Sequence, residues 1–202
     1  MTHIATSTRT AERGGFVPVS RSHETDDASL LARVLKPYKP ACRYVLAAKV
    51  SRCADEAEGE RVVTRCELSI PESCYIDDTG HFNSVEFNIC YNQMVYFAIA
   101  KTVQEQMMPA FHGWSLDDFW RKQLPDILIT RFESCFRKPV QPRRFHGEVT
   151  LTRARSSGGP SPMMLMRTTC RFWDDEGGHC DGNIALALLN VPQRNDGARE
   201  GE

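Results

Sequence analysis

The chain has 202 residues, of which 41% are hydrophobic, and its net charge at pH 7 is −1. This length suits one domain with a sizeable core, and the balanced charge does not indicate a nucleic-acid partner. The longest apolar runs, residues 94–100 and 184–189, are far shorter than the roughly 18–20 residues that cross a bilayer. We therefore expect one domain without a membrane span.

The cysteines and histidines show no metal-binding or disulfide pattern. Eight cysteines are spread without a C-x-x-C motif, at positions 42, 53, 66, 74, 90, 135, 170 and 180. The N-terminal stretch lacks the apolar segment of a secretory signal, so we expect reduced thiols in a cytoplasmic protein. His112, His146 and His179 lack metal-ligand spacing, and we expect neither a metal nor another cofactor.

Both ends of the chain are polar and lack hydrophobic periodicity. We expect a flexible leader at 1–26, a folded domain at 27–192 and a flexible tail at 193–202. Asp27 is placed to cap a short helix, "ASLLARVLK", which Pro37 ends. The segments "CRYVLAAKVSRC" and "ERVVTRCELSI" have strand composition and predict a hairpin.

The longest predicted helix covers residues 84–106, after a turn at Gly80. Ser115 and Asp118 have the spacing of a capping box for a further helix, "LDDFWRKQL". Four strand-like segments complete the domain: "DILITRFESCF", "FHGEVTLTRARS", "MMLMRTTCRFWD" and "NIALALLN". Strands must bury one face, and a single long helix is a suitable cover. The pattern predicts an α+β hot-dog fold, a curved antiparallel sheet wrapped around a long central helix; a generic α+β sandwich is the alternative.

Several amides lie in this long apolar helix, where burying an unpartnered amide would cost roughly 1–3 kcal/mol. Asn88, Asn92 and Tyr96 recur every four residues and share one stripe of the helix. An asparagine does not titrate usefully, but its oxygen can hold a water while its nitrogen donates. We therefore interpret Asn92 as a water-positioning residue, and Asn83 as a helix cap, a catalytic residue or both.

Two titratable residues lie near the start of the same helix. His81 is a candidate for touching the substrate, although a histidine entering a helix more often holds the turn. Glu86 is the second candidate for a base, about 120° of helix rotation away from Asn92. We expect the free backbone N–H groups and the positive dipole end of this helix to polarise a substrate carbonyl.

The stretch "RFESCFRKPVQPRR" is strongly basic, with Glu133 as its one acidic residue. One interpretation is a solvated strand and loop. The other is a docking patch for an acidic carrier protein or for the phosphates of coenzyme A. Its candidate residues are Arg137, Lys138, Arg143 and Arg144.

Four motifs together resemble the FcoT-type acyl thioesterases of actinobacteria: "ESCYIDDTGHFNSVEFNICYNQMVYFA", "GWSLDDFW", "FRKPVQP" and "FWDDEGG". The resemblance covers residues 30–192 and implies a hot-dog fold that hydrolyses an acyl thioester held on coenzyme A or a carrier protein. It also implies an active site of two tyrosines and two asparagines, which map onto Tyr38, Tyr75, Asn83 and Asn92. Some similar proteins, in pathways to isonitrile lipopeptides and β-amino-acid-containing polyketides, add glycine to an α,β-unsaturated acyl thioester and then hydrolyse the N-carboxymethyl-3-amino acid product.

Our leading hypothesis is a thioester hydrolase that also adds glycine at the β-carbon, with Arg43 as the partner of the glycine carboxylate and Asn88 at the substrate. Three alternatives stay open: a plain long-chain acyl-CoA thioesterase, a hot-dog hydratase or dehydratase, and a non-catalytic acyl-binding module. The dehydratases use a histidine with a carboxylate, whereas this chain has Asn92 in place of that carboxylate. Because open edge strands are usually paired or covered, we expect a homodimer or a higher homo-oligomer.

Overall fold

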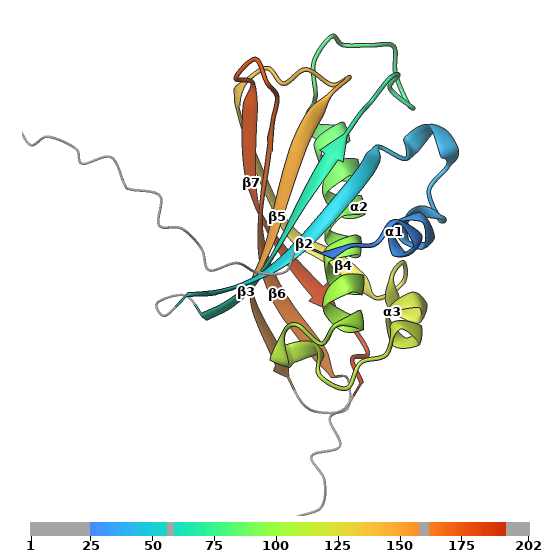
Figure 1. The fold of residues 1–202 in the computed structure, drawn as a ribbon, viewed down its shortest axis with the longest axis vertical. Helices are drawn as coiled ribbons and strands as arrows, with labels where there is room; N and C mark the ends of the chain where they lie inside the picture. Colours follow the sequence, from blue (N-terminus) through green and yellow to red (C-terminus); the bar gives the residue numbers. More distant parts are fainter. Residues whose placement is uncertain (1–24, 56–58, 158–161, 193–202) are drawn as a thin grey trace, which may run out of the picture.

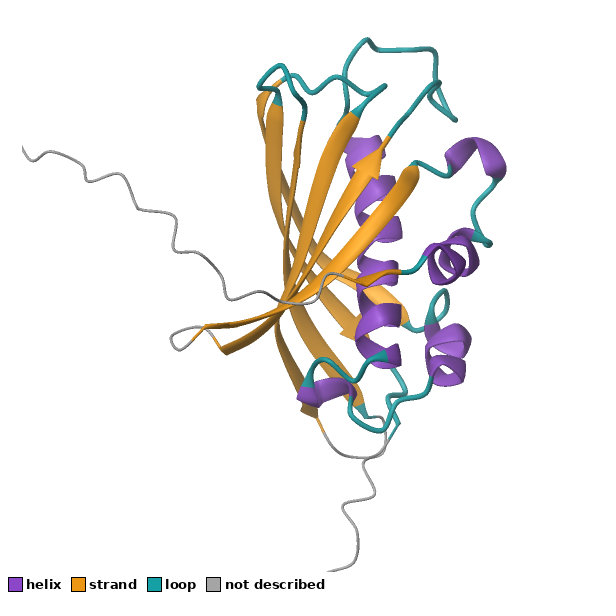
Figure 2. Ribbon diagram, viewed as in Figure 1, coloured by secondary structure: helices purple, strands orange, loops and turns teal. Residues whose placement is uncertain are grey.

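A computed structural model describes residues 25–55, 59–157 and 162–192. One long helix lies along the concave face of a curved antiparallel sheet, and two short helices lie beside it (Figures 1 and 2). The helices are α1 (Ala28–Leu35), α2 (Ser84–Gln104) and α3 (Leu116–Lys122), with 3-10 turns at Pro40–Cys42 and Pro109–Phe111. The strands are β1 (Thr25–Asp26), β2 (Val45–Asp55), β3 (Gly59–Leu68), β4 (Ile127–Lys138), β5 (Phe145–Ser157), β6 (Met163–Trp173) and β7 (His179–Leu188).

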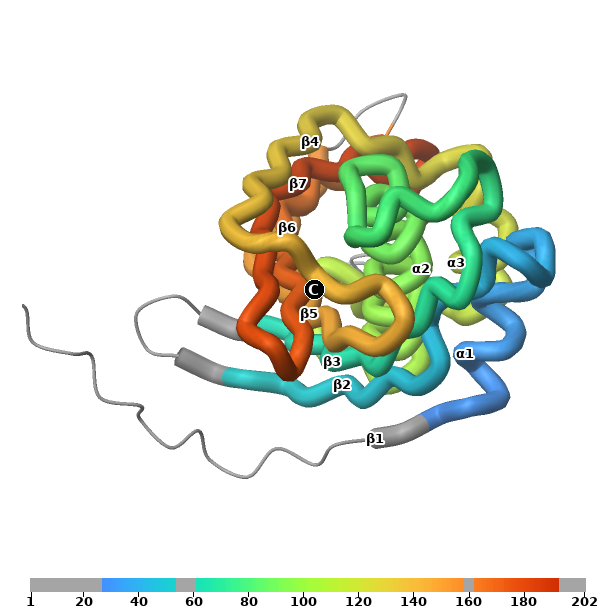
Figure 3. Tube along the Cα trace, turned by 90° about the horizontal axis from the view of Figure 1, so that it is seen from above, coloured from blue at the N-terminus to red at the C-terminus, as the bar shows by residue number. Residues whose placement is uncertain are grey.

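The strands pair in the order β1-β2-β3-β5-β6-β7-β4, so β4 lies at one edge of the sheet. In Figure 3 the sheet passes around α2 from β2 to β4, and α1 and α3 lie on the remaining side. This arrangement is the hot-dog fold that the sequence predicts. No helix within the three described ranges has the length and apolar character needed to span a membrane.

The local start signals read from the sequence are confirmed. Asp27 Oδ1 accepts from Leu30 N at 2.9 Å and caps α1. Ser115 Oγ accepts from Asp118 N at 3.1 Å, while Asp118 Oδ2 accepts from Ser115 N at 2.9 Å, which completes the capping box of α3. Each bond satisfies a backbone group that the first helical turn leaves without a partner.

Three boundaries differ from the predicted ones. The leader does not extend to residue 26, because Thr25–Asp26 pairs with the edge of β2 as β1; residues 1–24 and 193–202 lie outside the described residues. Helix α2 ends at Gln104 rather than at 106, since Gln106 has a left-handed φ of 51° that cannot continue a helix. Strand β7 begins at His179, four residues before the predicted segment "NIALALLN".

The sheet and α2 approach each other closely at two glycines. A Cβ atom on Gly147 would lie 2.7 Å from Met94 Sδ, and one on Gly182 would lie 2.9 Å from Phe87 Cζ. Only glycine leaves room for such contacts. This close approach brings Phe87 of α2 against Phe172 of β6, and their rings pack edge to face with centroids 4.8 Å apart.

Gln93, one of the unexpected amides of α2, has a structural role. It is fully buried, and its Oε1 accepts from Tyr44 N at 2.9 Å and from Val45 N at 3.2 Å. Its Nε2 donates to Cys42 O at 2.5 Å. These bonds tie the start of β2 to the middle of the helix, so the amide is buried with its partners satisfied.

The first turns of α2 are more open than its last turns. Val85 is 46% exposed, whereas Ile99 is fully buried. The later turns contact α1 and α3. The polar stripe of α2 therefore begins at an accessible surface, where the candidate site is found.

Candidate active site at the start of the central helix

Asn83 is the N-cap of α2 and its side-chain oxygen is fully used. Oδ1 accepts from Val85 N at 3.0 Å and from Glu86 N at 3.2 Å, and Glu86 Oε2 accepts in return from Asn83 N at 3.3 Å. This capping box occupies the N–H groups of Val85 and Glu86, two of the backbone donors that we expected to be free for a substrate carbonyl. The Nδ2 of Asn83 makes no hydrogen bond to any described residue and is an available side-chain donor at this helix end.

Tyr75 joins Asn83 directly. Its hydroxyl donates to Asn83 Oδ1 at 2.8 Å, and the tyrosine is 46% exposed. The loop that carries it is tied to the core, because Cys74 N donates to the hydroxyl of the buried Tyr44 at 3.3 Å. At the end of the loop, Phe82 N donates to Val140 O at 3.0 Å. The third hydrogen bond on Oδ1 further fixes the amide and keeps Nδ2 directed away from the helix.

Asn92 and Asn88 form a pair on the polar stripe of α2. Asn92 Nδ2 donates to Asn88 Oδ1 at 2.7 Å and to Asn88 O at 2.9 Å. Because Nδ2 already donates to Asn88, it is not free to donate to a substrate as we expected. Its Oδ1 has no hydrogen-bond partner among the residues that the structure describes, so it can accept one from a substrate or a water.

Tyr38 lies in the loop after α1, near Tyr96 and Cys90 of α2. Burial raises the pKa of Tyr38 strongly, and the neighbouring Tyr96 and Cys90 raise it further. The phenol is therefore protonated and can donate a hydrogen bond. Of the four residues implied by the resemblance, Tyr75 and Asn83 are bonded to each other, whereas Tyr38 lies beside Tyr96 and Asn92 is bonded to Asn88.

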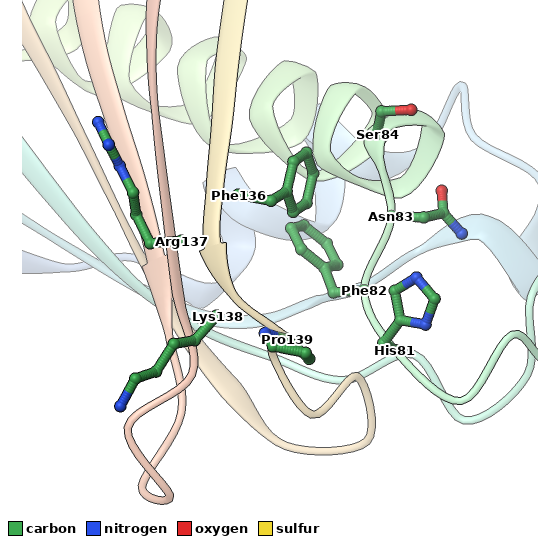
Figure 4. A pocket seen from close by; sticks show the side chains of 8 residues that line it. All are labelled: His81, Phe82, Asn83, Ser84, Phe136, Arg137, Lys138 and Pro139. Atoms are coloured by element: carbon green, nitrogen blue, oxygen red, sulfur yellow. The ribbon is translucent and has the colours of Figure 1, made fainter.

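A cavity of about 420 Å³ opens between the start of α2 and the end of β4. Figure 4 shows its lining, with Asn83 and His81 on one wall and Phe136 on the other. The apolar floor includes Phe82, whose ring centroid is 6.4 Å from that of Phe136. The cavity is thus apolar inside and polar at the helix end, which suits an acyl thioester with its carbonyl at Asn83.

Glu86 and Arg43, two further candidates, are engaged elsewhere. Glu86 is only 2% exposed, and its carboxylate belongs to the capping box of α2. The guanidinium of Arg43 donates to Tyr38 O at 3.0 Å and to Lys36 O at 3.2 Å. Arg43 therefore holds the loop of Tyr38, and Glu86 holds the start of the helix.

Two of the four basic candidates already have acidic partners. Arg137 Nε lies 3.3 Å from Asp181 Oδ1, and Arg143 Nη2 lies 3.3 Å from Asp78 Oδ2. Lys138 and Arg144 are exposed and form no ion pair with any described residue. Arg137 and Lys138 line the cavity together with Ser84 and Pro139. Within the described ranges, no group of three His, Cys, Asp or Glu side chains is arranged to hold a metal ion.

The family model of the FcoT-like thioesterase domain matches residues 33–188. The chain belongs to the FcoT-like thioesterase family. It is 53% identical over 169 residues to a (2E)-enoyl-[ACP] glycyltransferase of Streptomyces coeruleorubidus, covering 82% of this chain and 99% of that protein. A protein of the same name from Mycobacterium tuberculosis (strain ATCC 25618 / H37Rv) is 35% identical over 192 residues, covering 95% of this chain and 98% of the relative.

Two solved structures of putative thioesterases match this chain at low sequence identity. The one from Syntrophus aciditrophicus SB is 13% identical with a TM-score of 0.43, covering 79% of this FcoT-like chain and 94% of its own. The one from Ralstonia eutropha JMP134 is 11% identical with a TM-score of 0.42, covering 79% of this chain and all of its own.

Sequence reasoning missed part of the cavity of this FcoT-like chain. Ser84, Phe136 and Pro139 line it, but only the curvature of the sheet brings the end of β4 to the start of α2. No local sequence pattern predicts that the end of β4 lies next to the start of α2.

Proposed function

We propose that the protein adds glycine to the β-carbon of a (2E)-enoyl thioester carried by an acyl carrier protein, and then hydrolyses the adduct to an N-carboxymethyl-3-amino acid. Membership of the FcoT-like family and the names of the glycyltransferase relatives support this reaction. The observation that carries it is Asn83: three hydrogen bonds saturate Oδ1, and Nδ2 is left as a donor beside an apolar cavity.

Asn83 stabilises the charge that develops on the thioester oxygen. When the amine adds to the β-carbon, the C=C π electrons move to the carbonyl and an enolate forms. A hydrogen bond from Nδ2 to that oxygen, at the positive end of α2, lowers the energy of this state. The same donor serves the tetrahedral oxyanion of hydrolysis, so one cavity supports both steps.

Asn92 positions the nucleophile. Its free Oδ1 accepts a hydrogen bond from the amine in the first step and from water in the second. Asn88 holds the amide in this orientation through the 2.7 Å bond from Asn92 Nδ2. Tyr38, kept protonated by burial, donates to the substrate farther along the helix.

The glycine carboxylate requires a cation. Arg43 is a weaker candidate than the sequence indicated, because two backbone carbonyls already accept from its guanidinium. Lys138 lines the cavity and has no ion pair within the described residues, so we assign it this role first. Arg144, likewise unpaired, then serves with Lys138 in docking an acidic carrier protein.

In the proposed function, a second copy of this chain covers the edge strand beside the cavity. Strand β4 forms an open edge next to the cavity, and Phe136 on it is 40% exposed. A second copy pairing with β4 would cover this edge, as folds usually require. We therefore include a homodimer or higher homo-oligomer in the proposal.

A hydratase or dehydratase is disfavoured, because Glu86 is committed to the capping box and the stripe of α2 offers Asn92 instead of a carboxylate. A plain thioesterase remains the second candidate, since hydrolysis needs the Asn83 donor but no glycine. Thiol release from a (2E)-enoyl carrier-protein thioester, followed with and without glycine, separates the two. Glycine-dependent release supports the proposal, whereas rapid release that is indifferent to glycine leaves a plain thioesterase.

A further inference from the structure

The ring of His81 is held in one orientation by the turn before Asn83. Its Nδ1 lies 3.0 Å from Thr79 O, and Thr79 Oγ1 donates back to His81 O at 2.8 Å. A carbonyl oxygen can only accept, so Nδ1 carries the proton in the neutral ring. The Nε2 atom then presents a lone pair, and it makes no hydrogen bond within the described part of the chain.

The proposed addition needs a base at this place. Glycine is an ammonium ion near neutral pH, and its nitrogen is not nucleophilic until one proton leaves. Asn83 and Asn92 cannot take it, and Glu86 is buried in the capping box. Imidazole is the side chain that ordinarily exchanges protons near neutrality, and His81 lines the same cavity as Asn83 (Figure 4).

We infer that His81 is the proton carrier of the glycine addition, an inference that rests on the proposed function. Its Nε2 takes one proton from the glycine ammonium, and the free amine forms the C–N bond at the β-carbon. The C=C π bond breaks to the enolate held by Asn83, and the α-carbon then takes a proton back from the imidazolium. The product is the saturated thioester with a secondary ammonium, so no proton is gained or lost overall.

The charges around His81 are compatible with this exchange. Asp78, on the same turn, accepts from Gly80 N at 2.8 Å and pairs with Arg143. From β4, Arg137 and Lys138 line the cavity, and the first is paired with Asp181. From α2, Glu86 is the nearest carboxylate, separated from the ring by its bond to Asn83 N. No described acid is bonded to Nε2, so this atom is open to the glycine ammonium.

His81→Asn is the informative variant, because the asparagine amide can still donate to Thr79 O while it cannot carry a proton. His179→Asn is the matched control: His179 Nδ1 makes the same contact with the carbonyl two residues earlier, Gly177 O, at 3.1 Å, and it does not line the cavity. Both proteins and the wild type are given an enoyl carrier-protein thioester and glycine over a range of pH, and the glycine adduct is measured.

We expect His81→Asn to form the adduct about 100-fold more slowly than wild type at pH 7, the usual contribution of a general base. The deficit should shrink as pH rises toward the pKa of free glycine, since solvent then supplies the neutral amine. His179→Asn should match wild type at every pH. A His81→Asn rate close to wild type, or a deficit that is the same at all pH values, would overturn the inference. If the wild type itself forms no adduct, the proposed function fails and this role of His81 fails with it.

Discussion

Replacing Asn83 by aspartate separates the two roles of this side chain. An aspartate retains an oxygen for Val85 N and Glu86 N, which now lie 3.0 and 3.2 Å from Oδ1. Aspartate and asparagine are comparable N-caps, and a negative charge is favoured at this helix end, although the Glu86 carboxylate opposes it. The free energy of unfolding should therefore stay within about 1 kcal/mol of wild type.

Activity should respond very differently, because aspartate lacks the Nδ2 donor. One preorganised oxyanion donor contributes about 10²–10³ in kcat. Steady-state thiol release from an enoyl thioester at saturating glycine measures this loss, and thermal unfolding of the same sample measures stability. Asn83→Ala provides the comparison: it loses both donor and cap, so it should be about 1 kcal/mol less stable, a fall in Tm of about 2–4 °C for a domain of this size.

The reasoning would be refuted by an Asn83→Asp protein that folds normally and turns over within a few-fold of wild type. The carbonyl would then be polarised by another group. An alanine variant as stable as the aspartate variant would contradict the capping role instead.

Asn92→Ala should lower kcat by up to about 100-fold with little change in Tm, because the proposed function assigns its unbonded oxygen to the nucleophile and its nitrogen bonds only to Asn88; near-normal turnover would place the nucleophile elsewhere. Burial raises the pKa of Asp174, but hydrogen bonds from backbone N–H groups outweigh it and leave the pKa below 3.8. The ionised Asp174 therefore stabilises the folded state fully above pH 3.8, and this stabilisation is lost as the pH falls through the lower pKa of the folded protein. In Asp174→Asn the free energy of unfolding should fall less steeply at acid pH than in wild type, and the same pH dependence in both proteins would contradict this. Arg144→Glu should raise KM for the carrier-bound substrate, most at low salt, and should raise it little for a short N-acetylcysteamine thioester, because Arg144 does not line the cavity; an equal rise for both substrates would contradict the docking role. Light scattering should give at least a dimer, and an active monomer at assay concentration would disprove the expected pairing through β4.

Most elements could be predicted from the sequence because their signals are local. Asp27, Ser115 and Asn83 start helices through partners no more than three residues away, so the cap and the element occur in the same short stretch. The alternating pattern of β6 likewise corresponds to its alternating burial. The extra strand β1 was missed because two residues carry no periodicity, and they pair only because the edge of β2 is available.

The site was predicted less completely, since its chemistry depends on distant partners. The sequence grouped Tyr75, Asn83, Tyr38 and Asn92 only through a family resemblance, and a 2.8 Å hydrogen bond joins the first two. It gave no sign that Arg143 would be paired with Asp78, or that backbone carbonyls would occupy Arg43. Such partners come from the tertiary fold, so residue type alone overestimated the number of free cations.

The central claim is that this chain joins glycine to an enoyl thioester before releasing an acid. The most direct test incubates the wild-type protein with a (2E)-enoyl carrier-protein thioester and isotope-labelled glycine, and determines the mass of the released acid. The account predicts an acid heavier than the enoic acid by one glycine and carrying the label. Release of unlabelled enoic acid alone, at the same rate with and without glycine, would contradict it.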